Sequence, residues 1–247
     1  MDQEALRELE SRCVQEEPPW CTAACPLHVD GRSVARHIGE GGWEKAWKVL
    51  QRYMPLPGIL GRICDAPCED RCKRSQAGGA IRMGALERAC VQTDPPEIRR
   101  LPMPAKGKKV AVTGSGLSSL SAAGDLAGKG YTVTVFEPTD RPGNPLRQWD
   151  PVLLPPDAID REIEALTRKG VQFELGKDPD SKVFADRCLN LFDAVYLGLD
   201  AVSGREWDLQ RNDDGTIRID AQTGLTSHAA VFAGGQTMSP VWRAAHG

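Results

Sequence analysis

The residues of this chain with the greatest potential for chemistry are cysteines grouped near its amino end. Six of the eight cysteines fall in the first third of the chain, at Cys13, Cys21, Cys25, Cys64, Cys68 and Cys72. Pro26 directly follows Cys25, and in two-cluster proteins a cysteine before proline ligates a different cluster from its neighbours. Thiolates grouped so tightly predict iron–sulfur clusters, and with them an electron carrier.

Disulfides and zinc are the alternatives for these cysteines. The first residues, Met1 to Glu4, are polar and acidic, unlike the basic and then apolar start of a secretory signal peptide. We therefore expect a cytoplasmic protein, and structural disulfides are rare in that reducing compartment. Structural zinc sites use cysteine pairs separated by two to four residues, and Cys64, Cys68 and Cys72 do not divide into two such pairs. Iron–sulfur ligation is favoured, with zinc as the main alternative.

Composition sets limits on the class of protein. The chain has 247 residues, 40% of them hydrophobic, which is enough for one large domain or two small ones. Its net charge of −3 and pI near 5.9 predict no surface for nucleic acid. No apolar run reaches the roughly 18 residues that a membrane helix needs, so no membrane insertion is predicted.

Short helices are expected to position the cysteines. Periodic apolar residues predict helices over residues 2–14, 31–37, 43–54 and 81–90. Residues 55–61 are predicted to form a turn-rich connection, and prolines between residues 93 and 104 predict an extended linker. We therefore expect a helical domain over residues 1–105, including the linker, and a second domain over residues 106–247.

The second domain begins with a pattern typical of dinucleotide binding. A predicted strand over residues 109–113 leads into Gly114-Ser115-Gly116, a predicted helix, a strand over residues 132–136 and Glu137. In this pattern the first glycine allows a tight turn, and the second lets the backbone approach a pyrophosphate at the helix N-terminus. The acid at the tip of the second strand, here Glu137, accepts hydrogen bonds from a ribose.

One position of this pattern departs from the usual one. Ser119 stands where the fingerprint has glycine or alanine, and we expect serine to be small enough for close packing of helix and strand. The alternative is a Rossmann-like unit that binds nothing.

The remaining elements follow from apolar runs between turn residues. Asp157 is expected to cap a helix that ends at Gly170. Strands are predicted over residues 171–175, 194–199, 216–220 and 230–233, and a helix could begin at residue 241. Cys188 is most simply a packed or surface cysteine.

Taken together, these residues resemble one family. It contains the small subunit of glutamate synthase, the N-terminal part of dihydropyrimidine dehydrogenase and the flavoprotein subunit of NADH-dependent ferredoxin:NADP oxidoreductase. The resemblance is carried by residues 11–13, 20–26, 61–72, 83–88, 114–119, 136–143 and 226–235. It implies an α-helical [4Fe-4S] domain followed by an α/β Rossmann-like, FAD-binding domain of the two-dinucleotide-binding type.

The resemblance also implies two clusters with interleaved ligands. One would use Cys13, Cys21, Cys72 and position 16, where this chain has Glu16 in place of the family's cysteine. A carboxylate is a harder ligand than a thiolate, so a Glu-ligated cubane, a three-iron cluster and no cluster all stay open there. The other cluster would use Cys25, Cys64, Cys68 and Glu87. Cys90 could replace Glu87, although a buried free thiol is the favoured interpretation of Cys90.

Implied FAD contacts gather around the glycine turn and the last strand. They are Gly114, Ser115, Gly116, Leu117, Ser118, Glu137, Pro142, Gly143, Arg147, Gly234, Gly235 and Gln236. Gln236 stands where the family has an acid, and Asn144 where it has glycine. Only about fifteen residues join the strands that flank the family's inserted NAD(P)H domain, so we expect no NAD(P) site.

The resulting hypothesis is an electron-transfer subunit without catalytic residues. Its [4Fe-4S] clusters would exchange electrons with FAD and with partners such as a catalytic oxidoreductase subunit or a ferredoxin-like subunit. One alternative is a structural iron–sulfur adaptor with a flavin-free Rossmann domain. A free-standing NAD(P)H-dependent enzyme is disfavoured by the missing domain.

Overall fold

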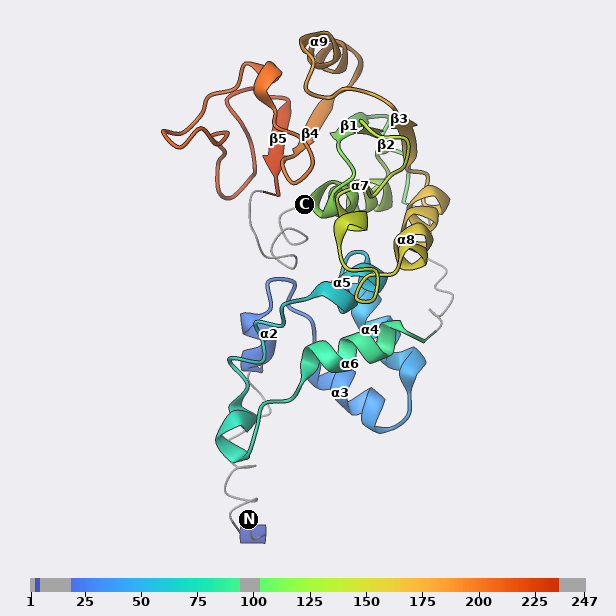
Figure 1. The fold of residues 1–247 in the computed structure, drawn as a ribbon, viewed down its shortest axis with the longest axis vertical. Helices are drawn as coiled ribbons and strands as arrows, with labels where there is room; N and C mark the ends of the chain where they lie inside the picture. Colours follow the sequence, from blue (N-terminus) through green and yellow to red (C-terminus); the bar gives the residue numbers. More distant parts are fainter. Residues whose placement is uncertain (1–2, 5–18, 94–102, 236–247) are drawn as a thin grey trace.

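The computed structural model describes residues 3–4, 19–93 and 103–235 of the chain. Helices make up its amino-terminal part and a parallel sheet with flanking helices its carboxy-terminal part (Figure 1). This order confirms the predicted fold class. Most of the helix predicted over 2–14, the linker core and the end of the chain lie outside the described residues, and with them Cys13, Glu16 and Gln236.

The helical part contains short helices joined by tight loops. They are α2 (Trp20–Ala24), α3 (Gly31–Gly39), α4 (Trp43–Tyr53), α5 (Pro57–Ile63), the 3-10 helix η1 (Lys73–Ala77) and α6 (Met83–Val91). Asp30 caps α3, because its side chain accepts a hydrogen bond from Ser33 N at 3.0 Å. In α4, Ala46, Trp47 and Leu50 recur at helical spacing and are buried.

The turn-rich connection predicted over residues 55–61 is wrong, because most of it is helix α5. Pro57 occupies the first turn, where its fixed φ suits a helix and its missing N–H costs nothing. Ile59, Leu60 and Ile63 bury their side chains on one face of the helix, which outweighs the two glycines of the segment. Helices α2 and η1 are also present without having been predicted.

Five strands of the described chain form one sheet in the order β3-β2-β1-β4-β5. They are β1 (Lys109–Thr113), β2 (Thr132–Glu137), β3 (Gln172–Leu175), β4 (Ala194–Gly198) and β5 (Val231–Gly234), and every neighbouring pair is parallel. The order reverses at β1, so the carboxyl ends of β1 and β4 mark the switch point where such sheets bind ligands.

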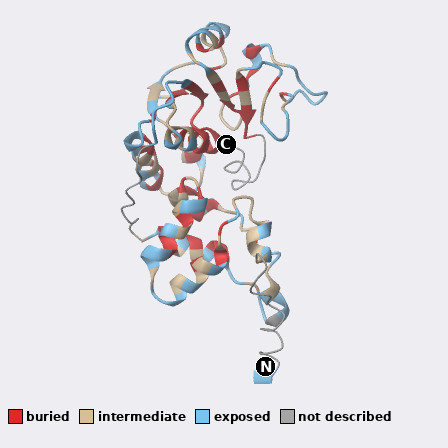
Figure 2. Cartoon of the chain, turned by 180° about the vertical axis from the view of Figure 1, so that it is seen from behind, coloured by how far each residue is buried: buried red, intermediate tan, exposed pale blue. Residues whose placement is uncertain are grey.

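Helices cover both faces of this sheet. Val110 and Val112 of β1 share a core with α7 (Leu117–Gly128) and α8 (Pro156–Arg168). Ala111, between them in sequence, joins a second core with α9 (Lys182–Leu191). This alternation follows from the two-residue period of a strand. The first core continues into α4 and α5, so buried residues run from the sheet into the helical part (Figure 2).

Three details of the carboxy-terminal part correct the expectations. Residues 216–220 contribute only an isolated antiparallel bridge, between Arg211 and Ile217, because the hairpin lies beyond the edge of the parallel sheet. Helix α9 was not predicted. Pro155, and not Asp157, is the residue that precedes the first turn of α8. The boundary at residue 105 stays a prediction.

No helix in the described part of the chain combines the length and the apolar character needed to cross a bilayer.

Candidate functional site

Three of the described cysteines of the helical part lie at helix ends. Cys25 ends α2, Cys64 ends α5 and Cys72 immediately precedes η1. Cys68 lies in the loop between α5 and η1 and is buried, whereas the other three are half-buried. All are free thiols. The ends of α2 and α5 therefore fix the backbone direction at Cys25 and Cys64.

Electrostatic interactions join three of these thiols to Glu87 on α6. Burial and, to a smaller extent, the nearby Glu87 carboxylate raise the pKa of Cys25, Cys64 and Cys68. For Cys68 the result is a pKa of about 12. Cys68 also interacts with Cys25 and Cys21, and Cys64 with Cys68. Four groups that would repel one another when ionised are therefore placed together. Such an arrangement suits a cationic centre, which stabilises thiolates and a carboxylate.

Glu87 itself is the clearest sign of such a centre. The residue is 5% exposed, and its Oε2 has no hydrogen-bond partner among the described residues. Burial and, to a smaller extent, the Glu69 carboxylate raise the pKa of Glu87 to about 7. An unpaired buried carboxylate is costly unless a cation compensates it. The residues Cys25, Cys64, Cys68 and Glu87 therefore fit an iron–sulfur cluster.

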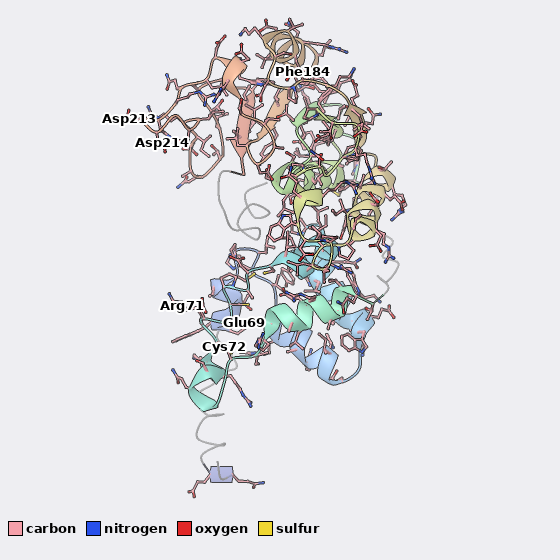
Figure 3. All side chains as sticks on the ribbon, viewed as in Figure 1. Glu69, Arg71, Cys72, Phe184, Asp213 and Asp214 are labelled. Atoms are coloured by element: carbon pink, nitrogen blue, oxygen red, sulfur yellow. The ribbon has the colours of Figure 1, made fainter. Side chains whose placement is uncertain are left out.

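The other predicted ligand set is only partly described. The ammonium group of Lys73 lies 4.6 Å from the centroid of the Trp20 ring, so the residues next to Cys72 and Cys21 lie side by side. Figure 3 shows Cys72 with Glu69 and Arg71 on the segment that runs along α2. Cys13 and Glu16 belong to the undescribed segment.

No three His, Cys, Asp or Glu side chains of the described ranges converge tightly enough to hold one metal ion. A cubane differs from a single ion because its iron atoms stand at separate corners, each bound by one protein ligand. Its ligands must therefore surround a volume and need not meet at a point.

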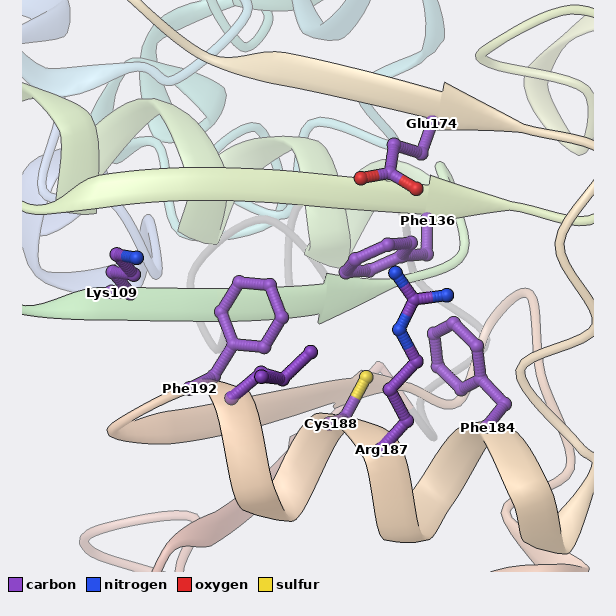
Figure 4. A pocket seen from close by; sticks show the side chains of 8 residues that line it. Lys109, Phe136, Glu174, Phe184, Arg187, Cys188 and Phe192 are labelled. Carbon is purple, nitrogen blue, oxygen red and sulfur yellow. The ribbon is translucent and has the colours of Figure 1, made fainter.

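The two remaining described cysteines lie elsewhere. Cys90 of α6 is fully buried with its Sγ 3.9 Å from the Trp43 carbonyl oxygen, as expected for a packed thiol. Burial and, to a smaller extent, Glu87 raise the pKa of Cys90 to about 11. Cys188 is 1% exposed and lines a cavity of about 220 Å³ between α9 and the sheet, with Phe136, Phe184 and Phe192 (Figure 4).

The glycine turn has the backbone expected of a Rossmann-like unit. Gly114 has φ of +72°, which glycine adopts without strain, and its N–H donates to the Phe136 carbonyl at 2.8 Å. Gly116 immediately precedes α7, so the first N–H groups of that helix face the switch point. Ser119 is fully buried, and its hydroxyl donates to the Thr113 carbonyl at 2.9 Å.

Close packing around Ser119 depends on a glycine in the neighbouring strand. A Cβ built on Gly198 of β4 would lie 1.8 Å from Ser119 Oγ and 2.8 Å from the Thr113 carbonyl oxygen. Serine is therefore accommodated at the third fingerprint position because Gly198 lacks a side chain.

Glu137 is engaged within the chain. It is 1% exposed, and its Oε2 accepts a hydrogen bond from Ser115 Oγ. Its Oε1 accepts from Thr139 N at 3.1 Å and from Thr139 Oγ1 at 2.8 Å. Gly143 N donates to Ser115 Oγ at 2.7 Å, which draws the predicted Pro142-Gly143 segment into the same network. In this arrangement a ribose would have to displace existing bonds.

The site also contains an acid that sequence reasoning missed. Asp200, two residues beyond β4, accepts hydrogen bonds from Ser118 N at 3.1 Å and from Ser118 Oγ at 2.7 Å. It occupies the N-terminus of α7, where a pyrophosphate would be expected. The residues in this arrangement do not fit a bound dinucleotide. Its position just after a strand at the switch point is the signal that could have revealed Asp200.

The other predicted flavin contacts are placed around this turn. Arg147 donates from Nε to the Pro142 carbonyl at 3.2 Å and forms an ion pair with Asp160 of α8. Its Nη1 is buried without a partner in the described structure. Gly234 ends β5. The neighbouring Gly235 has φ of +88°.

Comparisons with known proteins confirm the resemblance in both parts of the chain. Residues 1–97 match the family described as dihydropyrimidine dehydrogenase domain II, 4Fe-4S cluster. Residues 112–157 match the NAD(P)-binding Rossmann-like domain. The second match partly conflicts with the expectation of no NAD(P) site, although it covers only the first strand–helix–strand unit and the segment up to the start of α8.

Curated relatives are longer redox subunits. The chain is 30% identical over 228 residues to the glutamate synthase (NADPH) small chain of Bacillus subtilis, covering 85% of this chain and 45% of that protein. It is 30% identical over 221 residues to the NADP(+)-dependent formate dehydrogenase subunit beta of Moorella thermoacetica, covering 79% and 31%. The chain thus spans less than half the length of these relatives. Their names do not favour the purely structural adaptor.

Among solved structures, histamine dehydrogenase from Rhizobium sp. 4-9 matches with a TM-score of 0.33 and 19% identity, covering 76% of this chain and 26% of that chain. A match this weak supports no structural argument.

Proposed function

We propose that this chain is an electron-transfer subunit of a multi-subunit redox complex, with a [4Fe-4S] cluster held by Cys25, Cys64, Cys68 and Glu87. The observation that carries the proposal is Glu87, a buried carboxylate whose Oε2 is unpaired in the described structure and which interacts with all three thiols. When bound, a cluster supplies one-electron transfer.

The chain's own residues would tune such a cluster. The backbone N–H of Ala66 donates to Cys64 Sγ at 3.3 Å, a bond that favours the thiolate form of Cys64. Hydrogen bonds to ligand sulfurs and burial are two of the ways in which a protein sets the potential of an iron–sulfur centre. The carboxylate of Glu87 would add a harder ligand than the thiolates.

A second cluster belongs to the same proposal. Its ligands would be Cys13, Cys21, Cys72 and Glu16, of which Cys21 and Cys72 lie on adjacent segments. The ring of Trp20 beside them is 52% exposed. Electrons would pass from this side to partner subunits, either a ferredoxin-like subunit or a catalytic oxidoreductase subunit. The cytoplasmic location stays a prediction.

FAD is the cofactor class that the resemblance suggests for the Rossmann-like domain. The glycine turn and the short strand–helix–strand unit support it, whereas the arrangement of Asp200 and Glu137 opposes it. We therefore assign the electron-transfer role to the iron–sulfur part and treat flavin as a separate component of the proposal.

The test is anaerobic purification of the chain with its partners, followed by measurement of iron, sulfide and flavin. Cys68→Ser is expected to remove one cluster, about four iron atoms per chain, and to destabilise the helical part, because cluster binding and folding are coupled. Cys90→Ala is the control, since Cys90 is also a buried cysteine but packs against α4.

Two results would refute the assignment. One is a Cys68→Ser protein with the iron and sulfide of the wild type. The other is native protein, isolated without air, that contains zinc and no iron.

A further inference from the structure

The carboxylate of Asp200 is enclosed by the residues that a dinucleotide would contact. A Cβ built on Gly116 would lie 2.5 Å from Asp200 Cγ and Oδ2, and one built on Gly235 would lie 3.1 Å from Oδ1. Ser118 supplies both a backbone N–H and a hydroxyl to the same carboxylate. Parts of β1–α7, β4 and β5 that are distant in sequence therefore converge on one acidic group.

We infer that Asp200 is an internal competitor for the pyrophosphate position, so that this chain binds a dinucleotide only when the Asp200 side chain is displaced. The inference rests on the flavin part of the proposed function and is independent of the clusters.

The first reason is that the donors are already used. The N-terminus of a helix after a glycine turn attracts anions because its first N–H groups have no partner within the helix. In this chain the N–H of Ser118, the second residue of α7, already donates to Asp200 Oδ2. A pyrophosphate would have to replace this bond before it gained one of its own.

The second reason is charge. Two like-charged groups that share a site disfavour each other's ionised forms, and a pyrophosphate beside Asp200 would place two anions in one site. Gly116 has no side chain, which in the usual fingerprint lets a pyrophosphate approach the backbone. In this chain the Asp200 carboxylate occupies that space.

The third reason is that the residue that binds Asp200, Ser118, is itself hydrogen bonded to a further residue. Ser118, fully buried, is also joined by a side-chain hydrogen bond to Tyr196 of β4. Burial raises the pKa of Tyr196, and Asp200 raises it further, as expected for a phenol enclosed beside an acid. Asp200 is therefore part of a packed network with Ser118 and Tyr196, and displacing it breaks both of its hydrogen bonds to Ser118.

The experiment compares FAD affinity between full-length variants purified anaerobically. Asp200→Ala removes the side chain, while Asp200→Asn keeps its volume and its acceptor for Ser118 N but removes the charge. We expect FAD fluorescence titration to show binding at least tenfold tighter for Asp200→Ala than for the wild type, with Asp200→Asn between them. Asp213→Ala, which removes an equal charge from an exposed loop remote from the turn (Figure 3), should match the wild type.

A second probe does not depend on the flavin ring. Sodium pyrophosphate should raise the melting temperature of Asp200→Ala and leave that of the wild type unchanged, because a ligand that binds only the folded state stabilises it. Iron content and circular dichroism equal to wild type establish that each variant is folded.

Equal FAD affinities in the wild type and both Asp200 variants overturn the inference, whether those affinities are high or undetectable. Absence of iron from all of the proteins, with the affinity difference intact, would instead refute the iron–sulfur assignment alone.

Discussion

At the level of single residues, two buried acids have opposite surroundings. Both oxygens of Glu137 are hydrogen bonded to Ser115 and Thr139 within the chain. Glu87 is comparably buried, yet its Oε2 is unpaired within the described residues. A buried carboxylate whose hydrogen bonds are satisfied stabilises the local backbone. An unpaired one lowers the free energy of unfolding unless a ligand binds it. Of the two acids, Glu87 is therefore the one whose carboxylate is available to bind a ligand.

A prediction for Glu87 follows from this cost. Glu87→Leu removes the carboxylate and keeps an apolar side chain of similar size, so the apo-protein should gain about 1–3 kcal/mol in its free energy of unfolding. The same substitution should lower iron and sulfide per chain. Urea unfolding of the apo-protein and metal analysis of the anaerobic protein measure the two effects.

The control for Glu87 is its neighbour Glu69. Its Oε1 accepts a hydrogen bond from Gly84 N at 2.9 Å, so Glu69→Leu should destabilise the apo-protein. A Glu87→Leu protein that is less stable than wild type while keeping all its iron would contradict the assignment of Glu87.

At the level of elements, α7 packs closely against β1 and β4 next to the glycine turn. The Ser119 hydroxyl uses the space left by Gly198, which joins the helix to two strands at once. The usual glycine or alanine of the fingerprint is thus replaced by a pair, a serine on the helix and a glycine on the strand.

A prediction for this pair is that Gly198→Ala overpacks the contact. We expect a loss of about 1–3 kcal/mol in the free energy of unfolding, measured by urea titration. Adding Ser119→Gly should restore only part of it, since the Thr113 carbonyl oxygen would still lie 2.8 Å from the new Cβ.

Gly128→Ala is the control for this contact, because a Cβ at Gly128 near the end of α7 meets nothing within 4 Å. It should be neutral or stabilising by up to about 1 kcal/mol. Equal effects of Gly198→Ala and Gly128→Ala would show that the contact with Ser119 does not limit the packing.

At the level of the whole molecule, α5 and α8 join the helical part to the sheet. The two helices pack together, and Glu162 of α8 accepts a hydrogen bond from Gly58 N in the first turn of α5. Glu162 is half-buried as a residue, while its carboxyl group lies within this junction. Burial raises the pKa of Glu162, and the Gly58 N–H partly opposes the shift.

The raised pKa of Glu162 determines how the free energy of unfolding changes with pH. A carboxyl with a higher pKa in the folded than in the unfolded chain holds its proton more tightly when folded. Its contribution to stability is therefore largest below the unfolded pKa of about 4.3 and declines as the pH rises through the higher folded value. Glu162→Gln keeps an acceptor for Gly58 and removes this titration.

We expect the stability of Glu162→Gln relative to wild type to increase with pH from about 4.3 and then to level off. Urea unfolding of the apo-proteins across this range measures the difference. Glu164→Gln, on the exposed face of the same helix, should show a smaller change with pH. A difference independent of pH would mean that Glu162 titrates alike in the folded and unfolded chains.

The sequence by itself determined the class of fold and most of its elements. The cysteine grouping and the glycine turn depend on residues close together in the chain, and periodic apolar residues locate α4, α6, β1 and β2 because local spacing decides which face is buried. Helix α5 escaped prediction because its stability comes from buried contacts with α6 and α8, which outweigh its local glycines.

Only the tertiary structure decided which groups meet. Glu87 joins Cys25, Cys64 and Cys68 through the packing of α6 on α5, and Asp200 reaches Ser118 because β4 lies beside β1 in the sheet. Each meeting depends on a parallel pairing or a helix contact between segments far apart in the chain. Local sequence patterns show which residues could bind a ligand. Burial and strand pairing across the fold decide which of these residues lack a hydrogen-bond partner within the described chain.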